Sequence, residues 1–430
     1  MKNRSKITNR DKISQLPDDL LFKILSLIPI RDAMSRCLLS KRWKLVWKMM
    51  PTLDFDENSY RNIGSLGFEE FFRTSLHSHE ARVLTSLNLK LSQHYRDAEC
   101  QFLLIIRHIL LEITIHSSSV SCSPVRFPRY LNIYKTLVVM KLQGRLVVEV
   151  SFPPVCFQSL KSLHLLRVNY RRLECLTSLL SACPILEDLF IERAGGDDGI
   201  KLFNISVPSL RRLSILELDS NHASRMCEIN TPLKYLKIED KRSRFNFVED
   251  MPNLVEAHVK ADHYETEKLL RLFSSVQRLS IHFFSSKFLH LVGTIFKQLL
   301  HLELHMHNRL HRTKILSFLK HSPNLQALKL NGKLLGSIRK KRRYVRKPSS
   351  VPKCLTFHLE SLEWRGYAGR PEDKEIAAYI LRNARCLKTA KVSYGKKHNL
   401  RIVKELKSLS EVLTSCQLVI QPQRPEVSIE

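Results

Sequence analysis

Histidines and a glycine-rich turn are the residues of this 430-residue chain whose types could do chemistry. The histidine group has no neighbouring cysteine and lacks the spacing of a zinc protease, and its first member falls on an expected strand. The glycine-rich stretch 194–199 lacks the Lys-Ser/Thr of a phosphate-binding loop, and its two acids would repel phosphate. No Gly-x-Ser-x-Gly motif occurs. We therefore expect no catalytic residue, no metal site and no cofactor; the histidines concerned are His301, His305, His307 and His311.

Ten cysteines are present, none in a Cys-x-x-Cys pair. That usage fits neither a disulfide framework nor a zinc module. Several lie beside apolar residues, as Cys386 does before Leu387, so we expect reduced thiols in the core. A ligase that transfers ubiquitin itself would need a reactive cysteine or Cys/His clusters, and the sequence shows neither.

Residues 11–57 have the pattern of three short helices, and we call them the front module. Two acids follow Pro17 and suit a helix start, because they offset its unpaired N–H groups. Trp43 and Trp47 lie four residues apart on one face of the third helix. A piece of about 45 residues buries little alone, so we expect another chain or the repeats to complete its surface. The first helix has a broad apolar stripe of Leu20, Leu21, Ile24, Leu25 and Ile28.

The front module resembles a plant-type F-box over its whole length. It shares the opening Leu16-Pro17, the Leu-Ser-Lys-Arg-Trp block at 39–43 and the closing Leu-Asp-Phe-Asp at 53–56. Such modules dock a Skp-family adaptor, which connects to a cullin and a RING protein. The alternative is that the apolar stripe only packs the module onto its own repeats. By resemblance, the adaptor contact consists of Leu16, Pro17, Leu20, Leu21, Ile24, Leu25, Leu38 and Trp43.

Residues 80–335 repeat the pattern apolar-x-x-apolar-x-apolar. Its first position, here called the anchor, recurs every 21 to 27 residues through eleven repeats, and then after 34 and 28 residues. Proline lies two residues before several anchors, as at Pro184, where a strand begins and no ladder N–H is needed. This spacing predicts leucine-rich repeats, with helical stretches at 176–180 and 314–320. The anchors are Leu84, Leu110, Leu137, Leu160, Leu186, Leu210, Leu233, Leu254, Val276, Leu299, Leu325, Leu359 and Leu387.

In each repeat the residues flanking the second apolar position should point outward from the sheet. They mix both charges with aromatic rings, which suits a protein partner with an acidic surface; an ordinary solvated face is the alternative. The outward pairs are Ser162/His164, Asp188/Phe190, Arg212/Ser214, Tyr235/Lys237, Glu256/His258, Arg278/Ser280, His301/Glu303 and Ala327/Lys329. The substrate contacts that we predict among them are Phe190, Arg212, Tyr235, Lys237 and Arg278.

The C-terminal part begins with a basic run and continues as strand, helix and strand. Seven basic residues and no acid fill 339–347, so we expect an exposed loop over 336–350, with nuclear targeting as one hypothesis. Pro371 starts a helix whose buried side is Ile376, Ile380, Leu381 and Ala384. Residues 351–425 resemble the FBD domain of plant F-box proteins, with matches at Cys354-Leu355, 359–364, Gly366, 379–381 and Asn383-Ala384. We expect this segment to cap the end of the solenoid.

The sequence therefore predicts an α/β fold: a small three-helix F-box, an irregular leucine-rich-repeat solenoid of parallel strands, and an FBD cap. Residues 1–12 show no apolar core of a secretory signal. The most apolar stretch, 102–115, is broken by charges, so we expect no membrane span. These features favour an intracellular protein, in the nucleus, the cytoplasm or both.

A net charge of +29 makes nucleic-acid binding the main alternative from another class. The front module, however, holds eight basic against seven acidic residues, a net of +1, which gives a groove-reading helix little attraction to phosphate. Nucleic-acid affinity that falls steeply with salt would favour this alternative.

We expect the substrate-recognition subunit of a Skp–cullin–F-box ubiquitin ligase, with no catalytic activity of its own. The front module would hold the adaptor, while the repeats hold a protein substrate near the ubiquitin-loaded enzyme and raise its effective concentration. A scaffold that binds partners without promoting their degradation is the third hypothesis. Accumulation of a bound partner after gene loss would distinguish the ligase from the scaffold.

Overall fold

The computed structural model divides the chain into two compact units, residues 1–210 and 211–430. It describes residues 13, 16–35, 41–60, 67–92, 109–118, 125–126, 135–148, 156–170, 172, 174–193, 202–217, 226–239, 244–248, 251–260, 270–283, 294–306, 311–332, 350–395, 404 and 416–422. Each unit is built on parallel strands that follow one another in chain order.

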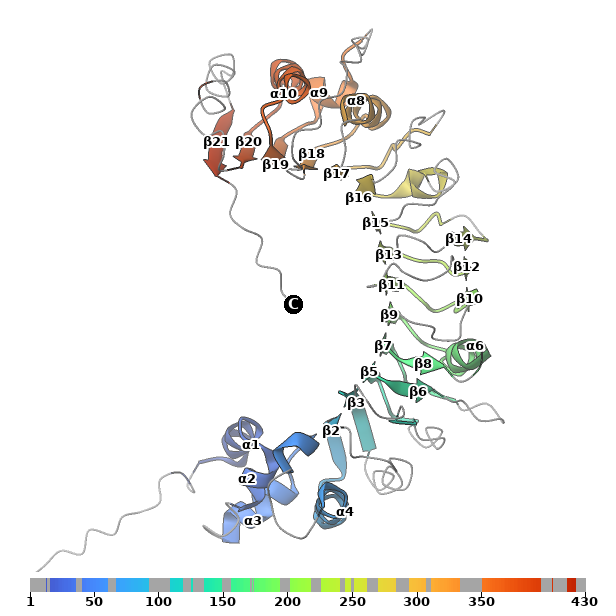
Figure 1. The fold of residues 1–430 in the computed structure, drawn as a ribbon, viewed down its shortest axis with the longest axis vertical. Coiled ribbons are helices and arrows are strands. Elements are labelled where there is room, and N and C mark those ends of the chain that lie inside the picture. Colours follow the sequence, from blue (N-terminus) through green and yellow to red (C-terminus); the bar gives the residue numbers. More distant parts are fainter. Residues whose placement is uncertain are drawn as a thin grey trace, which may run out of the picture. The chain divides into compact units, whose positions relative to one another are not determined.

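The front module forms the three helices that its sequence predicts. They are α1 (Asp18–Ser26), α2 (Ile30–Ser35) and α3 (Lys41–Lys48), followed by β1 (Thr52–Asp56), the short 3-10 helix η3 (Glu57–Tyr60) and α4 (Phe68–Ser78). Figure 1 shows α1, α2 and α3 grouped beside α4 and the first strands of unit 1. The two tryptophans of α3 are 4–5% exposed, so this chain completes their packing itself.

Unit 1 carries a parallel sheet in the order β1-β2-β3-β5-β7-β9. Its strands after β1 are β2 (Val83–Leu91), β3 (Ile109–Ser117), β5 (Val139–Gly144), β7 (Ser162–Leu166) and β9 (Asp188–Arg193). The shorter strands β4 (Val125–Arg126), β6 (Leu146–Val148) and β8 (Asn169–Tyr170) pair in a second sheet, and β10 is Leu202–Ile205. The predicted helix at 176–180 is confirmed as α6 (Glu174–Ser181).

The sheet of unit 1 begins earlier than the sequence analysis placed it. Residues 53–56, assigned there to the end of the F-box, lie in β1, which pairs in parallel with β2 and aligns Leu53 with Leu87 and Phe55 with Leu89. The front module is therefore continuous with the repeats through its last strand. Residue 80, where we placed the start of the repeats, follows one complete strand and helix.

Unit 2 continues the same architecture with nine parallel strands among its described residues. They are β11 (Arg212–Glu217), β13 (Tyr235–Glu239), β15 (Glu256–Lys260), β16 (Arg278–Phe283), β17 (His301–Met306), β18 (Ala327–Gly332), β19 (Ser361–Tyr367), β20 (Thr389–Tyr394) and β21 (Gln417–Pro422). The short strands β12 (Met226–Ile229) and β14 (Arg244–Phe247) pair separately. Its helices include η5 (Phe273–Ser275), α8 (His311–His321), α9 (Lys353–Phe357) and α10 (Pro371–Asn383).

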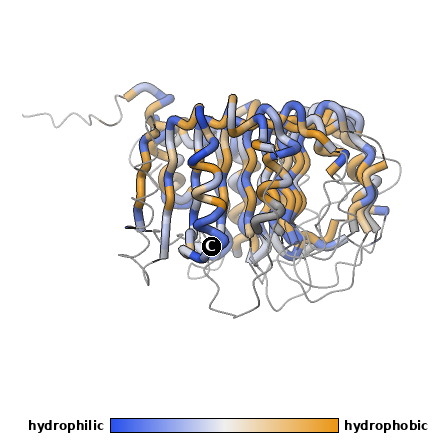
Figure 2. Tube along the Cα trace, turned by 90° about the horizontal axis from the view of Figure 1, so that it is seen from above, coloured by the Kyte–Doolittle hydropathy of each residue, from blue (hydrophilic) through white to orange (hydrophobic). Residues whose placement is uncertain are grey.

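The repeat anchors form the core, as predicted. All thirteen are at most 2% exposed. After most anchors, two successive N–H groups donate to one carbonyl of the preceding repeat, as Lys234 and Tyr235 do to the carbonyl of Arg211. Buried and accessible residues alternate along strands such as β13 and β15, which is the two-residue period of a strand with one covered face. Figure 2 shows this alternation as a change of hydropathy along the strands.

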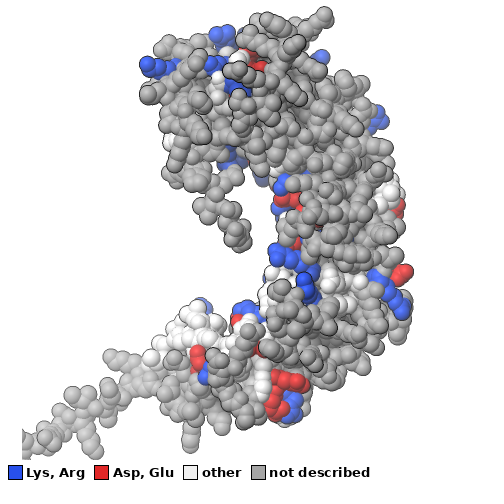
Figure 3. Space-filling model, in the orientation of Figure 1, with Lys and Arg blue, Asp and Glu red and all other residues white. Residues whose placement is uncertain are grey.

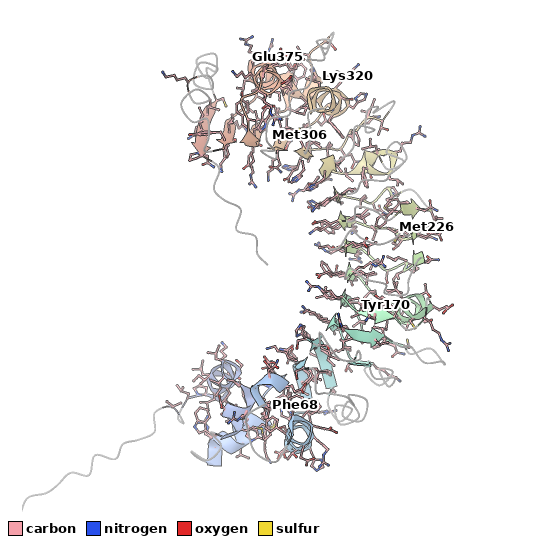
Figure 4. The ribbon with its side chains drawn as sticks, in the orientation of Figure 1. Phe68, Tyr170, Met226, Met306, Lys320 and Glu375 are labelled. Carbon is pink, nitrogen blue, oxygen red and sulfur yellow. The ribbon has the colours of Figure 1, made fainter. Side chains whose placement is uncertain are left out.

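The helices of unit 2 lie on one side of its later strands. In Figure 1, α8, α9 and α10 lie above β17 to β20, and the other side of these strands carries no helix among the described residues. Figure 4 shows side chains projecting to both sides of the strands, with Lys320 and Glu375 labelled on α8 and α10 and Met306 at the end of β17. One face of the sheet is thus left for partners or solvent.

The C-terminal segment, which we expected to cap the solenoid, forms the last described strands of the sheet of unit 2. The predicted strand–helix–strand unit is present as β19, α10 and β20, but both strands pair in parallel in the sheet of unit 2, and β21 adds a further strand. The described part of β21 holds no buried residue, since Leu418 and Ile420 are half-buried. In sequence, the leucine pattern of a terminal segment is the same as that of a further repeat.

The structure describes most of the cysteines but not the basic run. Cys386 is exposed, although its Sγ donates to the Phe357 carbonyl at 3.3 Å, whereas Cys175, Cys183, Cys227 and Cys354 are buried thiols. The basic run 339–347 lies outside the described residues. Among the helices that the structure describes, none is both long and apolar enough to cross a bilayer.

Candidate partner-binding surfaces

Helix α1 presents two apolar faces, one buried and one exposed. Leu21 and Leu25 are 0% exposed and form the core of the front module. Leu20, Ile24 and Leu27 are 43%, 37% and 84% exposed. Their spacing of four and three residues places them on one side of the helix, and exposed Pro17 precedes them by one turn. We call Pro17, Leu20, Ile24 and Leu27 the α1 stripe.

The structure separates the predicted adaptor residues into three groups. Pro17, Leu20 and Ile24 lie on the α1 stripe, and Leu16 is half-buried beside it. The prediction of direct contact needs correction for three residues that have almost no exposed surface, because they pack within the chain: Leu21, Leu25 and Trp43. Leu38 lies outside the described residues.

Arg42 of α3 fixes the segment that leads into α1. Its Nη2 donates to the Leu16 carbonyl at 2.6 Å and to Asp18 Oδ1 at 2.7 Å. Charge-assisted bonds of this kind are stronger than neutral ones and hold a preferred geometry. The Leu-Ser-Lys-Arg-Trp block therefore supplies a buried Trp43 that packs the module and an Arg42 that orients the start of the stripe.

The front module packs on helix α4 and the segment that follows it in unit 1. Phe55 of β1 meets Phe72 of α4 edge to face with ring centroids 4.8 Å apart. His79 Nε2 lies 3.0 Å from the carbonyl of Met50, in contact with the Trp47 ring at 6.3 Å. Figure 4 labels Phe68 at the start of the same helix α4. These contacts cover the inner residues of the module and leave the α1 stripe uncovered.

The open strand face contains the predicted substrate residues, which the structure places in both units. In unit 1, the half-buried Phe190 stacks on His164 of the neighbouring strand at 5.7 Å. In unit 2, the guanidinium carbon of Arg212 lies 4.6 Å from the centroid of the Tyr235 ring. The ring of His258, on the strand at the other side of Tyr235, has its centroid 5.7 Å from the same ring. The outward positions are accessible as predicted, except Ser280, which is buried.

Arg212, Tyr235 and Lys237 are brought together on β11 and β13, whereas Arg278 lies on β16, two strands from β13. The ammonium group of Lys237 pairs with Glu239 at 2.9 Å, so its charge is already compensated. Figure 3 shows basic and acidic side chains mixed on the strands around β13 and β15. Within the described part of the chain, no three His, Cys, Asp or Glu residues are grouped closely enough to hold a metal ion.

Comparison with known proteins identifies three regions of the chain. Models of the F-box domain, a Leucine Rich Repeat and FBD match residues 13–54, 159–184 and 347–392. A putative FBD-associated F-box protein of Arabidopsis thaliana is 58% identical over 428 residues, which cover 96% of each chain. The chain belongs to the F-box/FBD/LRR-repeat family. A putative F-box/FBD/LRR-repeat protein of the same plant is 47% identical over 96% of this chain and 98% of its own, and another F-box/FBD/LRR-repeat protein is 39% identical over 95% and 99%.

Three exposed apolar residues of the F-box were missed by the sequence analysis. Leu27 is the most exposed large apolar residue of α1, at 84%. Leu45 and Met49 are 60% and 47% exposed and lie four residues apart on and just after α3. A complete helical wheel would have found them, because the buried stripe of α3 (Trp43, Val46, Trp47 and Met50) leaves Leu45 and Met49 on the opposite side.

Proposed function

We propose that this protein is the substrate-recognition subunit of a Skp–cullin–F-box ubiquitin ligase. The F-box binds a Skp-family adaptor and, through it, a cullin and a RING protein. The open strand face binds a protein substrate, and the transfer of ubiquitin belongs to the partners. Such a complex would act in the nucleus, the cytoplasm or both.

The observation that carries this proposal is the exposed α1 stripe. Three large apolar side chains and a proline on one side of a single helix have no cover from the described part of the chain. An apolar patch of this kind typically marks a protein interface, and its burial in a partner is favourable by about 25 cal/mol per Å². The F-box match at 13–54 supports a Skp-family adaptor as the partner.

Adaptor binding by charge variants of the stripe tests the proposal. We expect Leu20→Asp with Ile24→Asp to weaken binding of a Skp-family adaptor at least about a hundredfold, because each buried carboxylate would have no partner. Leu16→Ala with Pro17→Ala should weaken it as well. Binding is measured by pull-down and by titration calorimetry with the full chain.

Ile185→Asp is the matched control, since Ile185 is 39% exposed and lies in the same unit but on a turn of the repeats. This variant should bind the adaptor as the unmodified chain does. Unchanged adaptor binding by the stripe variants, with their circular dichroism intact, would remove the proposal.

Substrate binding is assigned to the open strand faces, with Phe190 as the proposed contact in unit 1 and Arg212, Tyr235, Lys237 and Arg278 as the proposed contacts in unit 2. Two aromatic rings in contact with histidines and an arginine offer large, preorganised contact area, which is typical of binding hot spots. Proximity labelling in cells, comparing the intact chain with Phe190→Ala and Tyr235→Ala variants, would show whether the same neighbours are lost from both.

A further inference from the structure

On the open face of unit 2, the glutamates have partners within the face, whereas some of the lysines and arginines form no ion pair with a described residue. Its strands from β13 to β20 carry four glutamates, and each one has a cationic or histidine partner within the face. Glu239 pairs with Lys237 at 2.9 Å and Lys260 at 3.2 Å, and Glu256 with His258 at 2.7 Å. Glu303 pairs with His305 at 3.0 Å, and Glu363 with Arg365 at 2.9 Å. All four are only partly accessible.

Three cations of the same face have no ion pair with a described residue. They are Arg278 on β16, Lys329 on β18 and Lys391 on β20, and all are exposed. We call them the basic row. The glutamates beside Lys329 in the strand register, Glu303 and Glu363, are held by their own partners, and Asn331 also donates to Glu303 at 2.6 Å. On these strands the face carries six lysines and arginines against four glutamates, so its net charge is positive with the histidines neutral; the six are Lys237, Lys260, Arg278, Lys329, Arg365 and Lys391.

The basic row has a regular spacing across the sheet. Lys329 and Lys391 share one register row, since each aligns with Glu363 of the strand between them. Arg278 lies two strands before Lys329, in the adjacent outward row. Two strand spacings amount to about 10 Å, which is also the length of about three residues of an extended peptide. An extended chain that follows the row of Lys329 and Lys391 would therefore meet these two cations about three residues apart, with Arg278 two strands before Lys329 and one outward row aside.

We propose that the basic row binds an extended acidic segment of a protein partner, with carboxylates spaced about three residues apart. The proposal rests on the assignment of the open face to substrate binding and names the chemical class of that substrate. The partner's carboxylates pair with Arg278, Lys329 and Lys391, and the neighbouring rings of Tyr235 and His258 provide apolar contact on β13 and β15.

The pKa of His301 can be used to follow binding at the basic row. It is exposed on β17, between the strands of Arg278 and Lys329. Burial is the largest cause that lowers the pKa of His301 below its ordinary value; the two cations also lower it, and Glu256 acts in the opposite direction. An anion bound beside these cations would favour the protonated form of His301. Binding of an acidic segment should therefore raise the pKa of His301, which NMR can follow.

Fluorescence anisotropy with synthetic peptides tests the proposal on the full chain. The probe is a labelled nine-residue peptide of glycine and serine with glutamate at every third position. We expect the triple variant Arg278→Glu, Lys329→Glu, Lys391→Glu to weaken its binding by at least about tenfold, because three attractive pairs become repulsive. A peptide with its three glutamates contiguous should bind the unmodified chain more weakly than the spaced probe.

The control triple is Lys234→Glu, Lys353→Glu, Arg382→Glu, three exposed positions of unit 2 outside the open face. Each triple removes three positive and adds three negative charges, so both change the net charge from +29 to +23. Equal weakening by both triples would overturn the proposal, as would equal binding of the two peptides or tighter binding of single-stranded RNA of the same charge. Affinity for the Skp-family adaptor is measured on the same samples. Because the basic row lies outside the F-box, the triple variant should bind the adaptor as tightly as the unmodified chain, which separates a failure of the peptide site from a failure of adaptor binding.

Discussion

At the scale of single residues, the histidines and the apolar residues of α1 make packing, stacking and ion-pair contacts. Histidines that could be metal ligands by type are instead partners of glutamates and of each other, since His282 and His305 stack at 3.7 Å and His305 bonds Glu303. Sequence reasoning found the apolar residues of α1 but not their division between core and surface. One broad stripe contains both faces, and only the packing of α1 on α3 decides which residues remain exposed.

Glu303 gives a prediction at this scale. The hydrogen bond from His305 lowers the pKa of Glu303 to about 2, against partial burial, and Asn331 adds a further bond. A carboxyl whose pKa is lower in the folded state stabilises the fold above its unfolded pKa of 4.5 and loses that contribution as the pH falls towards 2. We expect Glu303→Gln to cost about 1–2 kcal/mol at pH 7, with the difference shrinking below pH 4.5.

Urea unfolding of the two proteins at several pH values measures this effect. Glu360→Gln is the control, because its pair with Lys388 is at the surface, with side chains 48% and 70% exposed, and should contribute little. A cost for Glu303→Gln that stays constant down to pH 2 would contradict the explanation.

At the scale of elements, the repeat pattern was largely readable. The anchors are buried at every predicted position, and the helices at 174–181 and 311–321 cover the predicted stretches, because spacing and proline position report strand starts directly. Two boundaries were not readable. The strand β1 and the strands β19 to β21 resemble the ends of separate domains in sequence, yet they pair with their neighbours in the sheets.

Gly366 provides the prediction at the element scale. It has φ +70° at an irregularity of β19, and an added Cβ would lie 2.0 Å from the carbonyl oxygen of Gly332 on β18. A side chain would therefore meet both backbone strain and a backbone clash. We expect Gly366→Ala to lower the free energy of unfolding by about 3 kcal/mol or more, measured in urea.

The matched substitution is Gly67→Ala at the start of α4, where an added Cβ meets nothing within 4 Å. It should cost less than about 1 kcal/mol. If Gly366→Ala cost no more than this control, the tight pairing of β18 and β19 would be in doubt.

At the scale of the whole molecule, each unit has a distinct part in the account. Unit 1 carries the F-box and its α1 stripe, while unit 2 carries the basic row. The net charge of +29 tempts a nucleic-acid interpretation, but the described glutamates and cations on the strands of unit 2 are interleaved, which suits a protein partner with spaced acids. Composition alone could not reveal this, because interleaving depends on strand register.

Hydroxyl-radical footprinting of the full chain, with and without a Skp-family adaptor, tests the central claim most directly. The account predicts that Leu20, Ile24 and Leu27 react in the free chain and are protected in the complex, whereas the buried Leu21 and Leu25 react in neither. Ile185 should react equally in both states. A complex that forms while the three α1 residues stay as reactive as before would contradict the account.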